Sequence, residues 1–482
     1  MNNSIISSLA QNIILNTDSY KISHYLQYPP GTREIFSYIE SRGGRYPQVV
    51  FFGLQMFLKD YLSQAVTHKQ VDEARDFIKQ HMPGMPFNEE GWRYIVDQHQ
   101  GQLPIRIKAV PEGTVVPVSN ALVTVESLDP KVAWIAQHIE AALMRAVWYP
   151  TTVATQSWNI KQMMQDWLDL SADSDEGLPF MLHDFGARGA SSYESAAIGA
   201  AAHLVNFMGS DTIPGVVAAQ AYYSADMPAF SIPASEHSTI TAWGEQREVD
   251  AYKNMLTQFA KPGSVLAVVS DSYDIYHAVE NIWGGELKQR VIDSGATLVI
   301  RPDSGDPVEV VSKLLKIAHK AFGASKNSKG YWSIDYVKII QGDGVNESSI
   351  NAILKRITDE GYAADNLAFG MGGALLQQLD RDTLKFAQKV SAINVNGEWR
   401  DVYKDPVTDT GKRSKRGRLT LAVNKHTGEY RSVRIDQPFP PEFEGALNMV
   451  YQNGVITHEV TFDEIRQQAL QRPMELPVAC EA

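Results

Sequence analysis

Two glycine-bearing loops have the composition of an anion site. The segments QGDGV (341–345) and GMGG (370–373) each follow a short apolar stretch and precede a helical pattern. Glycine lets the backbone approach a ligand closely, so successive N–H groups can converge on an anion, and a helix that begins there adds the positive end of its dipole. Tight turns also use glycine for steric reasons alone, but two such loops in neighbouring units predict a phosphate site.

Charged side chains lie in a third loop, RPDSGDP (301–307), where Arg301 and Asp303 are two residues apart. Arg can hold a phosphate or a carboxylate through two parallel hydrogen bonds, while Asp can accept from ribose hydroxyls or hold Mg²⁺. The loop therefore suits a phosphorylated sugar. The alternative is a mutual ion pair that caps the following helix.

Two further loops carry an aromatic ring and a histidine. HDFGARG (183–189) places Phe185 near Arg188, so a flat ring could stack beside a bound anion; the alternative is a buried Phe and a surface Arg. ASEHSTITAW (234–243) contains His237, and histidine is suited to accept and pass on a phosphoryl group or a proton near neutral pH. A structural histidine is the alternative.

Several well-known site signatures are absent from the sequence. It has no HExxH motif and no compact His/Asp/Glu cluster, which argues against a dedicated zinc site. It also lacks a G-x-S-x-G elbow, a Walker A loop and the kinase motifs, so any use of ATP does not go through a P-loop. The densest basic run, KRSKRGR, is a solvated loop or an anion clamp; its cations are Lys412, Arg413, Lys415, Arg416 and Arg418.

The loops follow apolar runs that alternate with helical patterns. The expected strands are 264–270, 296–301, 336–340 and 366–369, and the clearest helices are about 308–322 and 347–360. Continuous apolar strands that alternate with amphipathic helices predict a parallel sheet covered on both faces, either a barrel or an open doubly wound sheet. In both architectures the ligand site lies at the C-terminal ends of the strands, where these loops fall.

The two ends of the chain show a different pattern. Residues 30–150 mix short alternating segments with helical ones such as 71–81, which is typical of an α+β region. After about residue 384 the chain returns to short strands, and we expect this tail to pack on the N-terminal region. The predicted domains are an N-terminal α+β domain (1–150) completed by residues 385–482, and a barrel-like domain (151–384).

Composition limits the class of protein. The 482 residues include 44 Lys and Arg against 56 Asp and Glu, a formal net charge of −12, and 44% are hydrophobic. This balance fits a globular protein and argues against nucleic-acid binding, which requires a basic surface. The single cysteine, Cys480, excludes an internal disulfide and a cysteine metal site. Because we find neither a signal peptide nor a run of roughly 20 apolar residues, we expect a cytoplasmic protein.

The loops and their surroundings match a known family in the same order over almost the whole chain. The matching segments are TDSYKISHYLQYPPGT, HDFGARG, HLVNFMGSDT, PASEHSTITAWG, VVSDSYDIY, IRPDSGDP, QGDGV, FGMGGALLQ and KDPVTDTGKRSKRGRL. They resemble the nicotinamide phosphoribosyltransferases. The resemblance implies an α/β type II phosphoribosyltransferase fold, with an irregular βα barrel-like domain and an α+β sheet domain formed by both chain ends.

The resemblance also implies a reaction. Members of this family transfer the 5-phosphoribosyl group from phosphoribosyl pyrophosphate to nicotinamide, giving nicotinamide mononucleotide and pyrophosphate in NAD salvage. The implied cofactor is Mg²⁺, ATP is a coupling substrate, and the implied assembly is a homodimer with shared active sites. The metal ligands stay open, with Asp303 and Asp271 as the candidates.

The resemblance further assigns roles to matched positions. His237 resembles the phosphoacceptor, and Asp303 and Asp271 are expected to assist catalysis. The residues expected to bind the pyridine and the ribose phosphate are Phe185, Tyr20 (from the other subunit), Asp211, Arg301, Asp303, Gly342, Asp343, Gly372, Gly373 and Arg381. Those expected to bind pyrophosphate or ATP are Arg188, His237, Arg301, Arg42, Lys389, Lys404 and Lys412.

Three positions depart from the family pattern. Met371 stands where the phosphate loop often carries Ser, Ala374 where it has a third Gly, and Ala187 where an aromatic residue is common. The backbone donors at Gly372 and Gly373 remain. We therefore expect a change in one hydroxyl contact and in the tunnel or the ATP pocket, and an intact phosphate site.

Two other functions fit part of the sequence. A nicotinate phosphoribosyltransferase shares the chemistry, but Asp211 would repel the carboxylate of nicotinate. A non-catalytic phosphosugar-binding protein on the same scaffold would keep the glycine loops without needing His237, Asp303 and the basic set together. Their joint presence favours the enzyme.

Overall fold

The computed structural model describes residues 12–408 and 413–471. The chain divides into two compact units. The first unit contains the residues up to Thr155, the segment Ala221–Ala225 and the chain from Leu379 onward, while the second contains Gln156–Gln220 and Asp226–Gln378. Both ends of the chain therefore belong to the same unit.

The first unit is built on a seven-stranded antiparallel sheet with the order β15-β14-β1-β5-β3-β19-β20. Its longest strands, β1 (Thr32–Ser41) and β14 (Phe386–Val395), are paired, and their register places Tyr38 opposite Lys389. The other strands are β3 (Ile105–Ala109), β5 (Ala121–Ser127), β15 (Glu398–Asp401), β19 (Asn448–Gln452) and β20 (Val455–Ile456). The three strands from the N-terminal part of the chain lie in the middle of this sheet, with two C-terminal strands on each side, so neither end can complete it alone.

Smaller sheets and helices complete the first unit. In α3 (His68–His81), Thr67 forms a capping box with Gln70, and the buried residues recur at helical spacing. The other helices of the unit are α2 (Leu54–Phe57), α4 (Glu89–Gln98), α5 (Ile135–His138) and α16 (Phe462–Leu470). The smaller strands are β2 (Gln48–Val50), β4 (Val115–Pro117), β16 (Leu419–Asn424), β17 (Tyr430–Arg434) and β18 (Phe443–Gly445).

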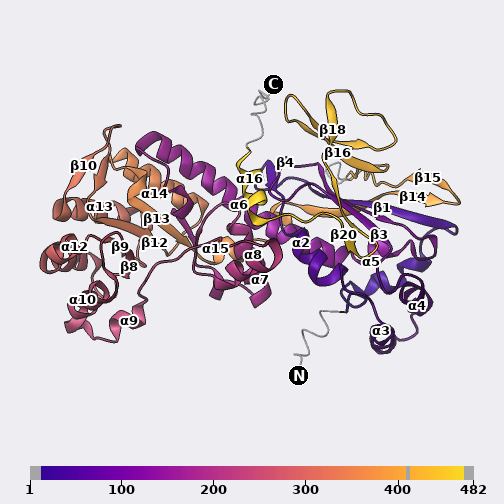
Figure 1. Ribbon diagram of the computed structural model, residues 1–482, viewed down its shortest axis with the longest axis horizontal. Coiled ribbons are helices and arrows are strands. Elements are labelled where there is room, and N and C mark those ends of the chain that lie inside the picture. The colour runs from indigo at the N-terminus through magenta and orange to yellow at the C-terminus, as the bar shows by residue number, and fades with distance from the viewer. Residues whose placement is uncertain (1–11, 409–412, 472–482) are drawn as a thin grey trace. The chain divides into compact units, whose positions relative to one another are not determined.

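The second unit is built on a six-stranded parallel sheet with the order β7-β6-β13-β12-β9-β8. Figure 1 shows β8, β9, β12 and β13 lying together, with α10, α12, α13 and α14 around them. The strands are β6 (Leu182–Asp184), β7 (Gly209–Ser210), β8 (Val265–Val269), β9 (Thr297–Arg301), β12 (Val337–Gln341) and β13 (Leu367–Met371). The near-continuous apolar sequences of β8, β9, β12 and β13 suit a sheet that is buried on both faces.

One segment connects the two edges of this sheet, and we call residues 230–235 the closing segment. Phe230 forms a parallel bridge with Gly209 at the β7 edge, and Ala234 forms one with Ala267 at the β8 edge. The N–H of Ala267 donates to the carbonyl oxygen of Pro233 over 2.9 Å. The sheet therefore curls into a barrel, which is one of the two architectures that the sequence left open.

The helices of the second unit lie between successive strands. In α13 (Pro307–Phe322), the Asp306 side chain accepts from the N–H of Glu309, and Pro307 occupies the first turn. The other helices are α7 (Tyr193–His203), α9 (His237–Thr241), α10 (Glu248–Phe259), α11 (Ile275–His277), α12 (Lys288–Ser294), α14 (Glu347–Asp359) and α15 (Gly373–Leu376). A hairpin of β10 (Ala324–Lys326) and β11 (Trp332–Ile334) is inserted before β12.

Two long helices include residues of both units. The division of the chain falls within α6 (Glu140–Ser171) and again within α8 (Ile213–Tyr223). No helix in the described ranges is long and apolar enough to cross a membrane.

Two helical segments of the second unit depart from a regular α-helix of several turns. The segment that follows β8 continues from α11 as a π-helix over Ala278–Glu286. The helix after the GMGG loop, α15, has four residues. Because the helix dipole depends on aligned peptide units, we assign the anion-binding capacity of this loop to its backbone N–H groups and not to a helix end.

Candidate active site

Asp271 is the centre of a hydrogen-bond network just beyond the C-terminal end of β8. Its Oδ1 lies 3.0 Å from Nε2 of His237. Its Oδ2 accepts from the backbone N–H of Asp303 over 3.0 Å and from the hydroxyl of Ser304 over 2.6 Å. The network links the loops after the closing segment, β8 and β9, and the Asp271 side chain is only 3% exposed.

His237 is the first residue of α9 and immediately follows the closing segment and Glu236. Its side chain is 45% exposed, so solutes can reach the ring. Since the Asp271 carboxylate accepts at Nε2, that nitrogen carries a proton. In the neutral ring Nδ1 then has the lone pair, and it lies 3.9 Å from Oδ2 of Asp303. A histidine held in this way by a carboxylate can act as a nucleophile or a base.

Arg301 and Asp303 do form the ion pair that the sequence left open, with 2.9 Å between Nη2 and Oδ1. The pair does not cap the following helix, because Asp306 does so. The guanidinium lies 5.7 Å from the ring centroid of Phe185. Its Nε is buried and has no hydrogen-bond partner within the described ranges, which leaves a donor for a ligand.

Phe185 is half-buried at the end of β6, where the backbone of two loops approaches its ring. A Cβ at Gly370 would lie 2.0 Å from Cε2 of Phe185, and one at Gly342 would lie 3.6 Å from the same atom. A Cβ at Gly342 would also lie 3.3 Å from Nε of Arg301. The absence of side chains at these glycines therefore admits both the aromatic ring and the guanidinium.

The second glycine loop lies beside the loop that contains Arg188. A Cβ at Gly189 would be 3.5 Å from Cα of Gly373, and a Cβ at Gly372 would be 3.6 Å from the carbonyl oxygen of Phe185. A Cβ at Gly373 would meet no atom within 4 Å, so the space beside it is open. Arg188 is exposed, and Asp343 lies in the first glycine loop.

Asp211 follows β7 and neighbours the Phe185 loop. Its backbone N–H donates to the carbonyl oxygen of Asp184 over 3.0 Å, and its Oδ1 accepts from the hydroxyl of Ser231 over 2.5 Å. Burial, together with the nearby Asp211, raises the pKa of Asp184 to about 6. Burial also lowers the pKa of His183, so this histidine is neutral at pH 7.

The remaining predicted residues lie in the first unit. Burial lowers the pKa of Lys389, and the positive charges of Arg42, Lys404 and Arg381 act in the same direction against the opposing effect of Glu140. These four cations therefore form one basic cluster. Tyr20 is 59% exposed, and Lys412 lies outside the described residues.

The rest of the basic run beyond Lys412 makes contacts within the first unit. Arg413 pairs with Asp405, and Lys415 pairs with Glu40. Arg416 and Arg418 lie over the rings of Tyr403 and Trp399, respectively. Within the described ranges, these residues therefore make contacts with other side chains of the first unit.

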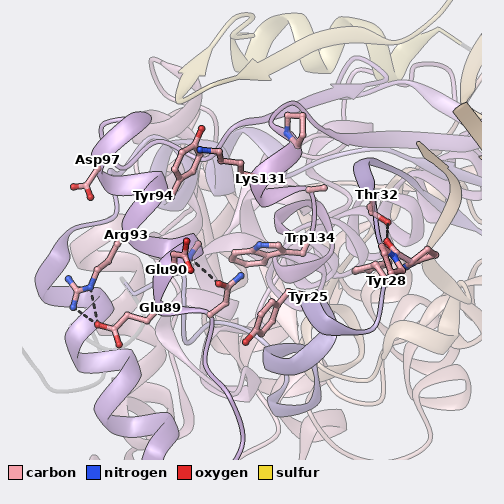
Figure 2. A pocket seen from close by; sticks show the side chains of 17 residues that line it. Tyr25, Tyr28, Thr32, Glu89, Glu90, Arg93, Tyr94, Asp97, Lys131 and Trp134 are labelled. Carbon is pink, nitrogen blue, oxygen red and sulfur yellow. Dashed lines mark hydrogen bonds and ion pairs between the residues drawn. The ribbon is translucent and has the colours of Figure 1, made fainter. Parts of the chain in front are cut away.

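A separate cavity of about 1110 Å³ lies in the first unit. Figure 2 shows Tyr25, Tyr94 and Trp134 on its wall together with the paired Glu89 and Arg93. None of the predicted site residues lines it.

The described residues contain no group of three or more His, Cys, Asp or Glu side chains that could hold a metal ion by itself. Both oxygens of Asp271 accept hydrogen bonds, and Oδ1 of Asp303 pairs with Arg301. Oδ2 of Asp303 is therefore the carboxylate oxygen best placed for a cation. One carboxylate combined with phosphate oxygens and water fits the coordination of Mg²⁺.

Family models and curated relatives match the chain over most of its length. A model of the nicotinate phosphoribosyltransferase (NAPRTase) family matches residues 180–454, and a model of the N-terminal domain of nicotinamide phosphoribosyltransferase matches residues 12–107. A nicotinamide phosphoribosyltransferase from Xanthomonas campestris is 58% identical over 95% of this chain and 98% of its own. The chain belongs to the nicotinamide phosphoribosyltransferase family.

More distant relatives extend this comparison. The nicotinamide phosphoribosyltransferase of Mycoplasma pneumoniae is 32% identical over 84% of this chain and 95% of its own. A crystal structure of nicotinate-nucleotide pyrophosphorylase from Pyrococcus furiosus is 17% identical with a TM-score of 0.64, covering 98% of this chain and 97% of that one. Human nicotinic acid phosphoribosyltransferase is 16% identical with a TM-score of 0.51, over 94% and 92% of the chains. These structures share the type II phosphoribosyltransferase fold.

Sequence reasoning within this family missed three residues of the site. Ser231 and Ser304 donate to the carboxylates of Asp211 and Asp271, but a lone serine in a strand or a loop carries no motif. Asp184 stands in the HDFGARG segment that resembles the family, but β6 is too short to show from sequence that this carboxylate is buried. Its Oδ1 accepts from the N–H of Gly186 over 2.7 Å and so shapes the turn after Phe185.

Proposed function

We propose that this chain transfers the 5-phosphoribosyl group of phosphoribosyl pyrophosphate to nicotinamide, giving nicotinamide mononucleotide and pyrophosphate. One arrangement supports the proposal most directly: the ring of Phe185 and the unpaired Nε of Arg301 both lie against the Gly342 turn. An aromatic platform and a cationic donor beside a glycine loop suit a flat base next to a sugar phosphate. The relative from Xanthomonas campestris, 58% identical, bears the name of this activity.

The chemistry requires positioning and charge stabilisation. Loss of pyrophosphate from the anomeric carbon passes through an oxocarbenium-like state, so the pyridine nitrogen has to be aligned with that carbon as the anion departs. Backbone N–H groups of the two glycine loops hold the 5-phosphate, and Asp343 accepts from the ribose. Phe185 stacks on the pyridine ring, a contact worth about 1 kcal/mol, and Arg301 binds beside it.

Asp211 selects the amide over the acid. Its carboxylate accepts an N–H of the carboxamide group of nicotinamide, whereas it repels the carboxylate of nicotinate at the same distance. Nicotinate phosphoribosyl transfer is therefore the minor activity.

ATP drives the reaction through His237. With Nε2–H held by Asp271, Nδ1 attacks the γ-phosphoryl group of ATP and ADP leaves, so that the P–O bond is exchanged for a P–N bond. The phosphoryl group adds negative charge beside Asp303 and draws the cationic groups of the site together for the second substrate. Hydrolysis of the phosphohistidine then returns the free ring.

Mg²⁺ is the proposed cofactor, held by Oδ2 of Asp303 and by substrate oxygens. When bound, it offsets the negative charge of the leaving pyrophosphate. The basic residues of the chain bind the same anion: Arg188, Arg42, Lys389, Lys404, Lys412 and Arg381.

The active assembly is a homodimer with shared sites. Tyr20 of one protomer covers the face of the pyridine ring opposite Phe185 of the other protomer. Its exposed ring is available for such a contact.

A mononucleotide assay tests the proposed function. The purified chain is supplied with phosphoribosyl pyrophosphate, Mg²⁺ and either nicotinamide or nicotinate, with and without ATP, and both products are separated by chromatography. We expect nicotinamide mononucleotide to dominate and its yield to rise with ATP. In the variant Asp211→Ser the preference for nicotinamide over nicotinate should fall at least about tenfold, because the carboxylate that repels nicotinate is gone. Faster use of nicotinate by the unmodified chain would contradict the assignment.

A further inference from the structure

The closing segment places one hydroxyl directly on Asp211. Ser231 Oγ donates to Oδ1 of Asp211 over 2.5 Å, and this hydrogen bond joins the closing segment to the residue that follows β7. Asp211 has no ion pair with any described residue. The hydroxyl is therefore the side-chain group that fixes the orientation of this carboxylate.

We propose that Ser231 is a positioning residue that determines pyridine selectivity by orienting the Asp211 carboxylate. The inference rests on the proposed function, in which Asp211 accepts from the carboxamide of nicotinamide. Because Oδ1 is occupied by the hydroxyl of Ser231, Oδ2 is presented to the substrate. A carboxylate with one oxygen fixed meets the amide N–H in a single orientation.

The backbone on both sides of this contact is held in place. The N–H of Asp211 donates to the carbonyl oxygen of Asp184, and the N–H of Ser210 donates to the carbonyl oxygen of Phe230 over 3.3 Å. The N–H of Phe230 donates in turn to the carbonyl oxygen of Met208 over 2.8 Å. Ser231 and Asp211 thus each follow a residue whose backbone is hydrogen-bonded to the other segment, which holds the two side chains beside each other.

The hydrogen bond between Ser231 and Asp211 contributes to substrate binding more than to the stability of the fold. Both side chains are exposed, and an exposed hydrogen bond contributes little to folding because water replaces it. A bound pyridine excludes that water, and the fixed carboxylate then strengthens the contact with the amide. Removal of the hydroxyl should therefore change substrate affinity and leave the melting temperature unchanged.

The test compares Ser231→Ala with a matched control. In Ser328→Ala the lost hydroxyl also donates to an exposed carboxylate, that of Asp173 over 2.6 Å, in the loop between β10 and β11. We expect Ser231→Ala to raise KM for nicotinamide about tenfold, with kcat nearly unchanged and a smaller preference for nicotinamide over nicotinate. Ser231→Thr, which keeps the hydroxyl donor, should restore both values, and Ser328→Ala should behave as the unmodified chain.

A double-variant comparison separates positioning from direct binding. In the Asp211→Ser background, Ser231→Ala should cause no further change in the ratio of nicotinamide to nicotinate use, because the carboxylate it orients is absent. The inference is overturned by an unchanged KM in Ser231→Ala, by failure of Ser231→Thr to restore it, or by an equal effect in the Asp211→Ser background. If that background has no measurable turnover, the Ser231→Thr result decides. Failure of the unmodified chain to use nicotinamide would instead refute the proposed function.

Discussion

The candidate base-binding residue and the candidate phosphoacceptor are held in different ways. Phe185 is held by steric packing, because its ring occupies the space that a Cβ at Gly370 would take. His237 is fixed by a hydrogen bond to Asp271 and remains accessible to solutes. A substitution that adds bulk beside Phe185 should therefore disturb base binding. Removal of the His237 imidazole should instead abolish the reaction with ATP.

Gly370→Ala tests the steric support of Phe185. The new Cβ would lie 2.0 Å from Cε2 of the ring, so Phe185 has to move. We expect kcat/KM for nicotinamide to fall at least about tenfold in steady-state kinetics, because misplacement of a stacked substrate is costly. Gly177→Ala, where a Cβ meets nothing within 4 Å and φ is −77°, is the control and should be silent. Equal kinetics in both variants would argue against a base-binding role for Phe185.

His237→Ala tests the coupling to ATP. The variant should lose ATP hydrolysis by more than about 100-fold and retain slow synthesis of the mononucleotide that no longer responds to ATP. Phosphate release and mononucleotide formation are measured in the same samples. ATPase activity equal to that of the unmodified chain would show that another group accepts the phosphoryl group.

At the scale of elements, the closing segment both completes the barrel and carries site residues. Its last residue, Ser235, is buried, and its Oγ accepts from the backbone N–H of Val269 over 2.9 Å. The following residues are Glu236 and His237, so the position of α9 depends on this contact between the closing segment and β8. Stability and catalysis are coupled at this point in the fold.

Ser235→Ala tests the contact between the closing segment and β8. The buried N–H of Val269 would lose its acceptor, and an unsatisfied buried donor costs about 1–3 kcal/mol. We expect the free energy of unfolding, measured by urea denaturation, to fall by this amount. Ser328→Ala removes an exposed hydroxyl from the same unit and should leave the midpoint unchanged. A urea midpoint for Ser235→Ala equal to that of the unmodified chain would mean that the contact between the closing segment and β8 does not depend on this side chain.

Asp184 makes the stability of the second unit depend on pH. Burial raises its pKa from 3.8 to about 6, so folding disfavours its charged form. The unfolded chain ionises first as the pH rises. The free energy of unfolding should therefore fall by about 2 kcal/mol between pH 4 and pH 6 and level off above about pH 7.

Asp184→Asn removes this titration and keeps an oxygen for the N–H of Gly186. The stability of the variant relative to the unmodified chain should therefore increase from pH 4 to pH 6.5. Chemical denaturation at several pH values measures the difference. Parallel curves over this range would mean that the Asp184 carboxyl is not perturbed by folding.

At the scale of the molecule, the site residues are divided between the two units. His237, Asp271, Arg301 and Phe185 belong to the second unit, while Tyr20 and the basic cluster around Lys389 belong to the first. The proposed homodimer assigns Tyr20 and Phe185 of one site to different protomers.

Subunit complementation tests the shared site. Tyr20→Ala and Phe185→Ala should each be nearly inactive, because every site of either homodimer lacks one ring. After the two proteins are mixed and allowed to exchange subunits, half of the dimers are mixed and one of their two sites is intact, so activity should recover to about a quarter of that of the unmodified chain. Absence of recovery, with exchange verified by native mass spectrometry, would place both rings in one protomer.

The sequence determined the local features of this protein. Continuous apolar runs identified strands such as β9 and β12, and helical spacing identified α13 and α14 within a few residues. Such patterns are local because each element buries its own face. The glycine loops and the Arg301–Asp303 pair were recognised for the same reason, as short segments whose residue types carry their chemistry.

Only the tertiary structure decided how distant segments meet. The closure of the barrel depends on residues 230–235 pairing with both sheet edges, and these residues carry no strand signal of their own. The bond between Ser231 and Asp211, the unpaired Nε of Arg301 and the raised pKa of Asp184 follow from burial and proximity. Those quantities depend on the packing of many segments at once, so no single stretch of sequence contains them.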